Sequence, residues 1–378
     1  MALRVGVIGG GQLARMMIAP AVELGLDLRV LAEEEGMAAS LAATAVGDYR
    51  DAATVLAFAR DVDVVTFDHE HVPQDVLAAL VEAGVIVRPG PDPLRYAQDK
   101  LLMRARLHEL GMPQPEWAAV SNADELQGFL DTHGGRAVVK TPRGGYDGKG
   151  VRVVSAGTEA DDWFTALAED ARGGALLAEE LVDFSRELAQ QVARRPSGQM
   201  RAYPVVETVQ RDGVCAEVIA PAPHGAGRLS QVASRIGLGI AEGLDVTGML
   251  AVELFETTDE RLLVNELAMR PHNSGHWTQD GAVTSQFEQH LRAVLDLPLG
   301  DPEPSAAWSV MVNILGGPET DSLDQRFAAV MEAYPAAKVH TYGKAPRPGR
   351  KVGHVTAVGE ELDEVAYEAR AAASFFED

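Results

Sequence analysis

Short apolar runs and longer amphipathic stretches alternate over the first ninety residues of the chain. The apolar runs are rich in β-branched residues and predict four strands, at residues 4–8, 27–31, 63–67 and 84–88. Between them, residues 12–25 and 73–84 have the apolar spacing of helices. Strands that alternate with helices form a parallel sheet with helices on both faces, so this region predicts an α/β domain.

The pattern changes after residues 88–100, a segment with three prolines that predicts a domain boundary. A helix is predicted over residues 101–111, and strands are predicted at 136–140, 150–155 and 175–182. A long region of antiparallel character follows, up to a second proline-rich junction at residues 295–308. The residues after that junction predict a small strand-rich domain that ends in a helix.

Two acidic residues stand out in the segment 248–276, which predicts two strands joined at Asp259 and Glu260. A two-residue turn there would place Glu253 directly opposite Glu266, with Cβ atoms roughly 4.5–5.5 Å apart. Apposed carboxylates repel each other unless a cation or a shared proton lies between them. Two carboxylates together with substrate phosphates are a common way to hold Mg²⁺, and the alternative is a solvated sheet edge.

A glycine-rich segment, TPRGGYDGKG at residues 141–150, predicts a loop that wraps phosphate groups. The P-loop pattern would need a glycine at position 143 and a hydroxyl at 150, but the chain has Arg143 and Gly150. Lys140 ends the apolar strand before this loop, where an ammonium group suits nucleotide phosphates or simply meets solvent. The loop therefore predicts phosphate binding of another kind.

The N-terminal loop Gly9–Ala14 fits G-x-G-x-x-[GA] between a strand and a helix, and Glu33 follows about twenty residues later. Free N–H groups at a helix N-terminus suit an anion. Three interpretations stay open: a dinucleotide site, a site for a phosphate-bearing substrate, and a tight turn that needs glycine.

Four cations lie close together near the C-terminus in the segment YGKAPRPGRKVGH: Lys344, Arg347, Arg350 and Lys351. Prolines and a glycine turn the backbone between them, so they can converge on a phosphate. A surface cluster without a ligand is the alternative. The histidines at 69, 71, 272 and 276 lack convincing partners for zinc.

Composition narrows the classes of function. The chain has 378 residues and a net charge of −23, which opposes binding to nucleic acid or to an anionic membrane. No apolar run reaches the roughly 18 residues of a membrane span. The single cysteine, Cys215, excludes an internal disulfide and is expected to be a small strand residue in a reducing, cytoplasmic compartment.

Taken together, these segments resemble the ATP-grasp ligases, in which two lobes clasp ATP and paired acidic residues hold Mg²⁺. Within that superfamily the chain is similar to the family of N5-carboxyaminoimidazole ribonucleotide synthetases. The resemblance rests on five segments spread over the chain in the family's order: GGGQLARM, GGYDGKG, EELVDFSRE, VELF…NELAMRPHNSGHWT and RPGRKVGH. By this resemblance, TPRGGYDGKG is the ATP-grasp phosphate loop.

The resemblance implies a fold of the α/β class in three parts. Residues 1–98 would form a Rossmann-like pre-ATP-grasp domain around a parallel sheet. Residues 99–298 would form a two-lobed ATP-grasp domain whose small lobe covers residues 115–182. Residues 299–378 would form a small β-rich C-terminal domain.

The resemblance also implies the roles of individual residues. Glu253 and Glu266 would bind Mg²⁺, in agreement with the hairpin pattern, and Arg270, His272 and Asn273 would lie near the bicarbonate-derived group. Ribonucleotide contacts are implied for Gln12, Glu70, Tyr146, Asp147, Lys344 and Arg350. ATP contacts are implied for Lys100, Lys140, Gly145, Tyr146, Asp147, Gly148, Lys149, Gly150, Val151, Glu179, Glu180, Leu181, Val182, Glu187, Gln210, Asn265 and Glu266.

The implied activity is carboxylation of 5-aminoimidazole ribonucleotide to N5-carboxyaminoimidazole ribonucleotide in de novo purine biosynthesis. ATP and bicarbonate would be consumed by way of carboxyphosphate, ADP and phosphate would be released, and the enzyme would be a homodimer. A sister ATP-grasp enzyme, the formate-dependent glycinamide ribonucleotide transformylase, is an alternative that uses formate. An NAD-dependent oxidoreductase is another, supported only by the N-terminal loop and Glu33. A non-catalytic nucleotide-binding regulator would not explain why both carboxylates and both lysines are present.

Four positions depart from the family pattern. Asp68 is shorter than the usual first acid of the acid-x-Glu motif, and Met269 replaces a usual proline. Pro142 replaces a usual basic residue, and Gln210 stands where some members carry histidine. These positions put single contacts in doubt and leave the implied function unchanged.

Overall fold

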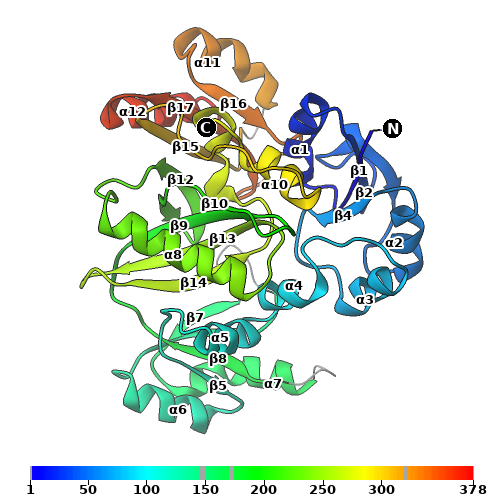
Figure 1. Cartoon of the computed structure of the whole chain (residues 1–378). Coiled ribbons are helices and arrows are strands. Elements are labelled where there is room, and N and C mark those ends of the chain that lie inside the picture. The colour runs from blue at the N-terminus through cyan, green and yellow to red at the C-terminus, as the bar shows by residue number, and fades with distance from the viewer. Residues whose placement is uncertain (1, 145–149, 170–173, 319–321, 378) are drawn as a thin grey trace.

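Three β-sheets organise the computed structural model, which describes residues 2–144, 150–169, 174–318 and 322–377. A parallel sheet holds the N-terminal strands, a nine-stranded sheet forms the centre, and a smaller four-stranded sheet lies apart from both. In Figure 1 the N-terminal sheet lies to the right, the small sheet at the bottom, and the C-terminal strands at the top. The predicted α/β class is confirmed.

The N-terminal sheet is wholly parallel, in the order β3-β2-β1-β4. Its strands are β1 (Arg4–Ile8), β2 (Asp27–Ala32), β3 (Ala43–Val46) and β4 (Val64–Phe67). The helices around it are α1 (Gln12–Glu23), α2 (Ala52–Ala59) and α3 (Gln74–Glu82). Strand β4 is buried along its whole length, as expected of a strand covered on both faces.

Two local predictions for this region need correction. The strand predicted at residues 84–88 is absent, because only an isolated bridge joins Val87 to Val65. Gly84, in a left-handed conformation, follows α3, and a proline follows Arg88, so little room remains for a strand. Strand β3 and helix α2 were not predicted, since elements of four and eight residues are too short to show a clear period.

The central sheet runs in the order β14-β13-β9-β11-β12-β15-β17-β16, and β10 pairs with β9. Its first strands are β9 (Phe184–Arg194), β10 (Met200–Ala202), β11 (Val206–Arg211), β12 (Val214–Ala220), β13 (Gly248–Thr257) and β14 (Leu262–Ala268). The C-terminal strands are β15 (Trp308–Leu315), β16 (Lys338–Thr341) and β17 (Lys351–Gly359). Because β12 pairs with β15, the C-terminal strands extend the central sheet and do not form a sheet of their own.

Helices of this half pack against the central sheet or border it. Ile236 and Ile240 of α8 (Arg228–Gly243) join the core that lies against β9 and β13. Ala369 of α12 (Leu362–Ser374) packs in the core against β15 and β17. The other helices here are α9 (Thr278–Gly281), α10 (Gln286–Val294) and α11 (Phe327–Ala333).

The small antiparallel sheet has the order β5-β8-β6-β7. Its strands are β5 (Trp117–Val120), β6 (Ala137–Lys140), β7 (Val151–Val154) and β8 (Leu176–Glu180). Helices α6 (Ala123–Thr132) and α7 (Asp161–Glu169) contribute to its core, while α4 (Pro91–Gln98) and α5 (Lys100–Glu109) connect it to the N-terminal sheet. Val151 and Val153 remain exposed, so no helix among the described residues covers this face of the sheet.

The hairpin of β13 and β14 pairs Glu253 with Glu266 as predicted, although the predicted turn is wrong. The loop has three residues, since the N–H of Thr257 donates to the carbonyl of Arg261 at 2.9 Å. Glu260 closes this loop with a φ of +61°. The resulting one-residue shift is cancelled by a bulge, because Leu254 pairs with Val264 and Asn265 is the extra residue.

His290 of α10 connects the N-terminal sheet to the central sheet. Its Nδ1 lies 3.1 Å from the backbone nitrogen of Met249 and accepts that N–H, so Nε2 carries the proton and donates to Thr66 Oγ1 at 2.8 Å. The ring is fully buried, and burial lowers the pKa of His290 to about 3. The neutral tautomer therefore holds β4, β13 and α10 together.

We expect this histidine to make stability fall as the pH falls below 6.5. Above pH 6.5 the folded and the unfolded chain both carry a neutral imidazole, so the contribution of His290 is fully present. Between pH 6.5 and 3 only the unfolded chain takes up the proton, which lowers the free energy of unfolding by about 1.4 kcal/mol per pH unit for this group. Urea denaturation between pH 7.5 and 5 measures the slope.

The matched variant is His290→Gln, which removes the titrating group and keeps side-chain donors and acceptors. The free energy of unfolding of this variant should change less steeply with pH than that of the wild type. The difference in slope should correspond to the uptake of about one proton. An unchanged slope would contradict the assignment.

Candidate active site

A cleft of about 1950 Å³ lies where the three sheets approach one another. Residues from the N-terminal loop, the start of α5, the small sheet, the β13–β14 hairpin and the segment before β17 all line it. The open face of the small sheet contributes Val138, Val151 and Val153 to its wall. The cleft thus combines an apolar wall with many charged groups, as ligand sites commonly do.

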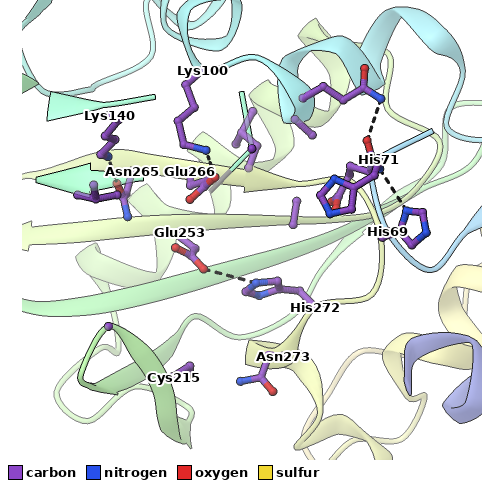
Figure 2. A pocket seen from close by; sticks show the side chains of 18 of the residues that line it. His69, His71, Lys100, Lys140, Cys215, Glu253, Asn265, Glu266, His272 and Asn273 are labelled. Carbon is purple, nitrogen blue, oxygen red and sulfur yellow. Dashed lines mark hydrogen bonds and ion pairs between the residues drawn. The ribbon is translucent and has the colours of Figure 1, made fainter. Parts of the chain in front are cut away.

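The two apposed carboxylates lie in this cleft. Burial and the neighbouring charge of Glu266 together raise the pKa of Glu253 to about 7, although 32% of its side-chain surface is accessible. Lys100 supplies one cation, with its Nζ 2.8 Å from Glu266 Oε1 (Figure 2). His272 Nε2 lies 3.4 Å from Glu253 Oε1, and burial lowers the pKa of this imidazole well below 6.5. At Glu253, burial and the neighbouring acids thus outweigh the charges of Lys351 and Lys140.

The bulge in β14 determines which side chains reach the cleft. Neighbouring strand residues normally point to opposite faces, but Asn265 and Glu266 both line the cleft. Asn265 Oδ1 accepts a hydrogen bond from Lys140 Nζ at 3.1 Å, as Figure 2 shows. Hence one irregularity brings an amide and a carboxylate to the same side.

The residues predicted to contact adenine lie at the end of β8, and Glu180, Leu181 and Val182 all line the cleft. Glu179 differs because its side chain is buried between two cations, with Lys140 Nζ 2.7 Å and Arg104 Nε 2.5 Å from its oxygens. Burial works to raise the pKa of Glu179, but the two cations outweigh it and lower the pKa. The side chain of Glu179 is therefore already paired with two cations at the edge of the cleft.

Glu187 and Gln210 also line this part of the cleft, from β9 and β11. Burial raises the pKa of Glu187, against the hydrogen bond from Gln210 and the charge of Lys140. Gln210 pairs with Cys215, next to a bulge in β12 where Ala216 is the extra residue. Cys215 is a buried thiol whose pKa burial raises to about 12, which agrees with the expected inert strand residue.

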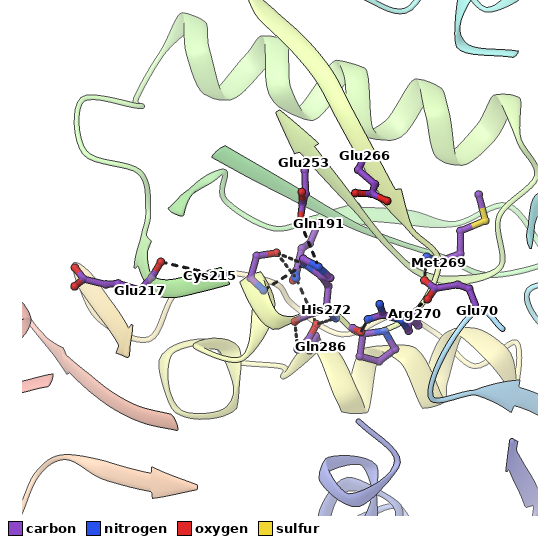
Figure 3. Close-up of polar contacts among 12 residues, drawn as sticks. Glu70, Gln191, Cys215, Glu217, Glu253, Glu266, Met269, Arg270, His272 and Gln286 are labelled. Carbon is purple, nitrogen blue, oxygen red and sulfur yellow. Dashed lines mark hydrogen bonds and ion pairs between the residues drawn. The ribbon is translucent and has the colours of Figure 1, made fainter. Parts of the chain in front are cut away.

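A network around Glu70 and Gln286 holds the segment after β14 (Figure 3). Glu70 accepts the N–H of Met269 at 3.1 Å and the Nε of Arg270 at 2.6 Å. Gln286 Oε1 accepts the N–H of His272 at 2.9 Å. Glu70 therefore acts in this structure as the anchor of Arg270.

Asn273 follows this segment and lines the cleft with 8% of its surface exposed. Neither polar atom of its side chain has a hydrogen-bond partner in the described structure. A buried amide in this condition calls for an explanation, and a polar ligand in the cleft would supply one.

The C-terminal cations line the same cleft from the opposite side. Lys344 Nζ donates to Gln12 Oε1, so the predicted ribonucleotide residues of the two chain ends meet. Arg350 contacts the carbonyl of Ala345 at 3.2 Å and lines the cleft with Arg347 and Lys351. All four predicted cations therefore border one cavity.

Known protein families match three consecutive segments of the chain. Residues 1–98 match the ribonucleotide synthetase preATP-grasp domain, residues 105–287 the ATP-grasp domain, and residues 309–368 the phosphoribosylaminoimidazole carboxylase C-terminal domain. The N5-carboxyaminoimidazole ribonucleotide synthase of Mycobacterium tuberculosis is 50% identical over 373 residues, which cover 98% of this chain and 86% of the relative. The chain belongs to the N5-carboxyaminoimidazole ribonucleotide synthase family.

Other family members agree along the whole chain. The synthase of Corynebacterium ammoniagenes is 50% identical over 384 residues, covering 98% of this chain and 91% of the relative. The synthetase structure from Thermus thermophilus has a TM-score of 0.85 at 36% identity and 98% coverage of both chains. A synthase from Aspergillus clavatus in complex with ADP and 5-aminoimidazole ribonucleotide has a TM-score of 0.88 at 30% identity, covering 100% of this chain and 99% of that chain.

The N-terminal loop of this family member is occupied by its own carboxylates, which corrects the NAD alternative. Asp68 Oδ1 accepts the N–H of Ala14 at 2.7 Å and thereby caps α1. Glu33 accepts the N–H of Gly10 at 3.0 Å and contacts His69 Nε2 at 3.1 Å. Burial would raise the pKa of Glu33, but these two contacts lower it to about 2. A dinucleotide would find these N–H donors and the acid already paired.

Glycine at position 11 follows from the same contact. A Cβ on Gly11 would lie 2.1 Å from Asp68 Oδ2, so no larger residue fits beside the capping carboxylate. The glycine pattern therefore allows the Asp68 carboxylate to approach the backbone closely and cap α1. This agrees with the interpretation of the loop as a tight turn that needs glycine.

The phosphate loop of the synthase family is described only at its ends. Predictions for Gly145, Tyr146, Asp147, Gly148 and Lys149 lie outside the described residues. At the base, the carbonyl of Pro142 accepts the N–H of Lys100 at 2.9 Å, and the carbonyl of Gly150 accepts the N–H of Thr141 at 3.0 Å. Pro142 therefore ties the loop to the start of α5.

Sequence reasoning missed two residues that organise the site. Arg104 follows Lys100 by one helical turn, and this i, i+4 pair of cations before an apolar strand was the available signal. Gln286 had no signal, because a glutamine at the start of α10 resembles any solvated helix residue.

We expect Asp68→Ala to lower the free energy of unfolding by about 1–2 kcal/mol, because the positive end of α1 loses its acceptor. Asp68→Asn keeps an oxygen at this position and should recover much of the loss. Chemical denaturation of both variants at pH 7 is the measurement. Equal stability of the two variants would argue against the capping role.

Proposed function

We propose that the chain carboxylates 5-aminoimidazole ribonucleotide to N5-carboxyaminoimidazole ribonucleotide, consuming ATP and bicarbonate and releasing ADP and phosphate. The observation that carries this function is the pair Glu253 and Glu266, apposed in the same cleft as Lys100, Lys140 and the C-terminal cations. Such a cleft can hold a nucleoside triphosphate and a second phosphate-bearing substrate at the same time. Family members whose structures contain ATP, or ADP with 5-aminoimidazole ribonucleotide, support it.

The ATP site would lie between the small sheet and the β13–β14 hairpin. Lys100, Lys140 and the loop residues 145–151 would contact the phosphates, and the main chain of residues 179–182 the adenine. Glu187 would take the ribose, with Gln210 beside it, and the exposed valines of β7 would supply an apolar wall.

Magnesium fits the residues that are present. Mg²⁺ prefers hard oxygen donors, and Glu253 and Glu266 provide two carboxylates next to the amide oxygen of Asn265. Among the described residues no three His, Cys, Asp or Glu side chains gather as a metal site, so nucleotide phosphates would complete the ligand set. A bound ion would neutralise charge on the transferred phosphoryl group.

The second half of the site would hold the ribonucleotide and bicarbonate. Gln12, Lys344 and Arg350 would bind the ribonucleotide, with Glu70, Tyr146 and Asp147 as further contacts. The guanidinium of Arg270, fixed by Glu70, and the unpaired amide of Asn273 suit the small bicarbonate-derived group. Neutral His272 would lie between this group and Glu253.

The chemistry then needs activation of a poor electrophile. An oxygen of bicarbonate takes the γ-phosphoryl group of ATP, ADP leaves, and carboxyphosphate forms. The amine of the ribonucleotide bonds to the carboxyl carbon, the carbon–oxygen bond to phosphate breaks, and the amine proton leaves. The lysines would stabilise charge on the phosphoryl group, and exclusion of water from the site would protect carboxyphosphate.

We further propose the domain boundaries after residues 98 and 298, a homodimer and a cytoplasmic location. The first boundary coincides with the end of α4, and the second falls between α10 and β15. The single buried thiol agrees with a reducing compartment. No described helix has the length and apolar character needed to cross a membrane.

ADP release in the presence of Mg-ATP tests the activity directly. Turnover should require the ribonucleotide and bicarbonate together and should give an acid-labile carboxylated product. Activity with formate would support the transformylase instead.

We expect Glu266→Ala to reduce ADP formation by about 10²–10³-fold or more while the fold persists, because one of the two proposed metal carboxylates is lost. The matched control is Glu260→Ala, which removes the same charge at the tip of the same hairpin and should leave turnover unchanged. Circular dichroism checks the fold of both. Wild-type turnover in Glu266→Ala would remove the metal assignment.

A further inference from the structure

Arg104 of α5 is fully buried, yet it belongs to a ring of polar contacts that opens onto the cleft. Its Nε contacts Glu179 Oε1, and the other oxygen of Glu179 lies 2.7 Å from Lys140 Nζ. Lys140 donates to Asn265 Oδ1 at 3.1 Å. Arg104 Nη2 donates to the carbonyl of Asn265 at 2.8 Å, which closes the ring.

The ring joins the two lobes at the bulge of β14. Lys140 and Glu179 belong to the small sheet, whereas Asn265 belongs to the central sheet. Arg104 Nη1 also donates to the carbonyl of Val264 at 2.7 Å, so one guanidinium holds two consecutive carbonyls at the bulge. Those bonds orient the segment that presents Asn265 and Glu266 to the cleft.

Charge balance gives Arg104 a second effect. Glu179 is shared between two cations, so Lys140 is only partly neutralised and can still attract an anion. Without Arg104, Lys140 would be the one cation of the ring left to pair with the buried carboxylate of Glu179. The lysine would then be held away from a nucleotide phosphate by a desolvated partner.

We propose that Arg104 is a positioning residue for the nucleotide and its metal ion, holding Lys140 and the Asn265–Glu266 bulge in register across the two lobes. This role rests on the proposed function, because it assigns Lys140 and Glu266 to Mg-ATP. Arg104 itself touches neither substrate. Lys100, one turn earlier on α5, contacts the side chain of Glu266. Helix α5 therefore holds Glu266 directly through Lys100 and indirectly through the contacts of Arg104 with the bulge.

The test is calorimetric binding of Mg-ADP to Arg104→Lys, without turnover. Lysine preserves a cation for Glu179 but cannot reach the carboxylate and two carbonyls together. We expect the Kd for Mg-ADP and the KM for ATP to rise by about 10–100-fold, as for other residues that orient metal ligands. The KM for aminoimidazole ribonucleotide should stay within about twofold, since its proposed site lies across the cleft.

Arg106→Lys is the matched control, because Arg106 lies on the same helix and donates to the carbonyl of Gly243 outside the cleft. Equal Mg-ADP affinity in Arg104→Lys and wild type, or an equal loss in both lysine variants, would overturn the positioning role. If Arg104→Lys does not fold, the Mg-ADP affinity of Glu179→Gln is the alternative test. This variant removes the charge that joins Arg104 to Lys140. Unchanged Mg-ADP affinity in that variant would also overturn the role. A wild-type chain that binds no Mg-ADP would overturn the proposed function itself and this role with it.

Discussion

The repulsion between Glu253 and Glu266 is the constraint on which the rest of the site depends. Two strands of one hairpin bring these carboxylates together in a cleft where burial makes their charge costly. The protein meets part of this cost with Lys100, while burial and the charge of Glu266 still raise the pKa of Glu253. Under the proposed function, the Mg²⁺ that accompanies ATP would meet the rest of this cost.

The surrounding architecture delivers cations to this point from distant parts of the chain. The small sheet brings Lys140, α5 brings Lys100 and Arg104, and the extension of the central sheet brings the segment 344–351. β14 and β16 lie at opposite ends of the strand order of the central sheet, yet the hairpin and the segment 344–351 both line the cleft. An acidic chain thereby gathers cations in the same cleft as its paired carboxylates.

Much of this site could be read from the sequence because its motifs are local. The glycine loop, the acidic hairpin and the C-terminal cations each occupy a short segment, and the structure places their described residues around one cleft. The pairing of Glu253 with Glu266 was predicted correctly, although the two-residue turn from which it was derived is wrong. A three-residue loop closed by Glu260 shifts the register by one, and the bulge at Asn265 shifts it back. Neither irregularity occurs at a glycine, so the sequence gives no signal for it.

The sequence by itself determined the order of the domains, the family and the residue types of the active site, because periodicity and short motifs depend on neighbours along the chain. Only the tertiary structure decided which polar groups are paired. Asp68 and Glu33 occupy the N-terminal N–H groups, Arg104 closes a ring across two lobes, and His290 joins two sheets. These contacts join residues up to 224 positions apart, so no local pattern can specify them.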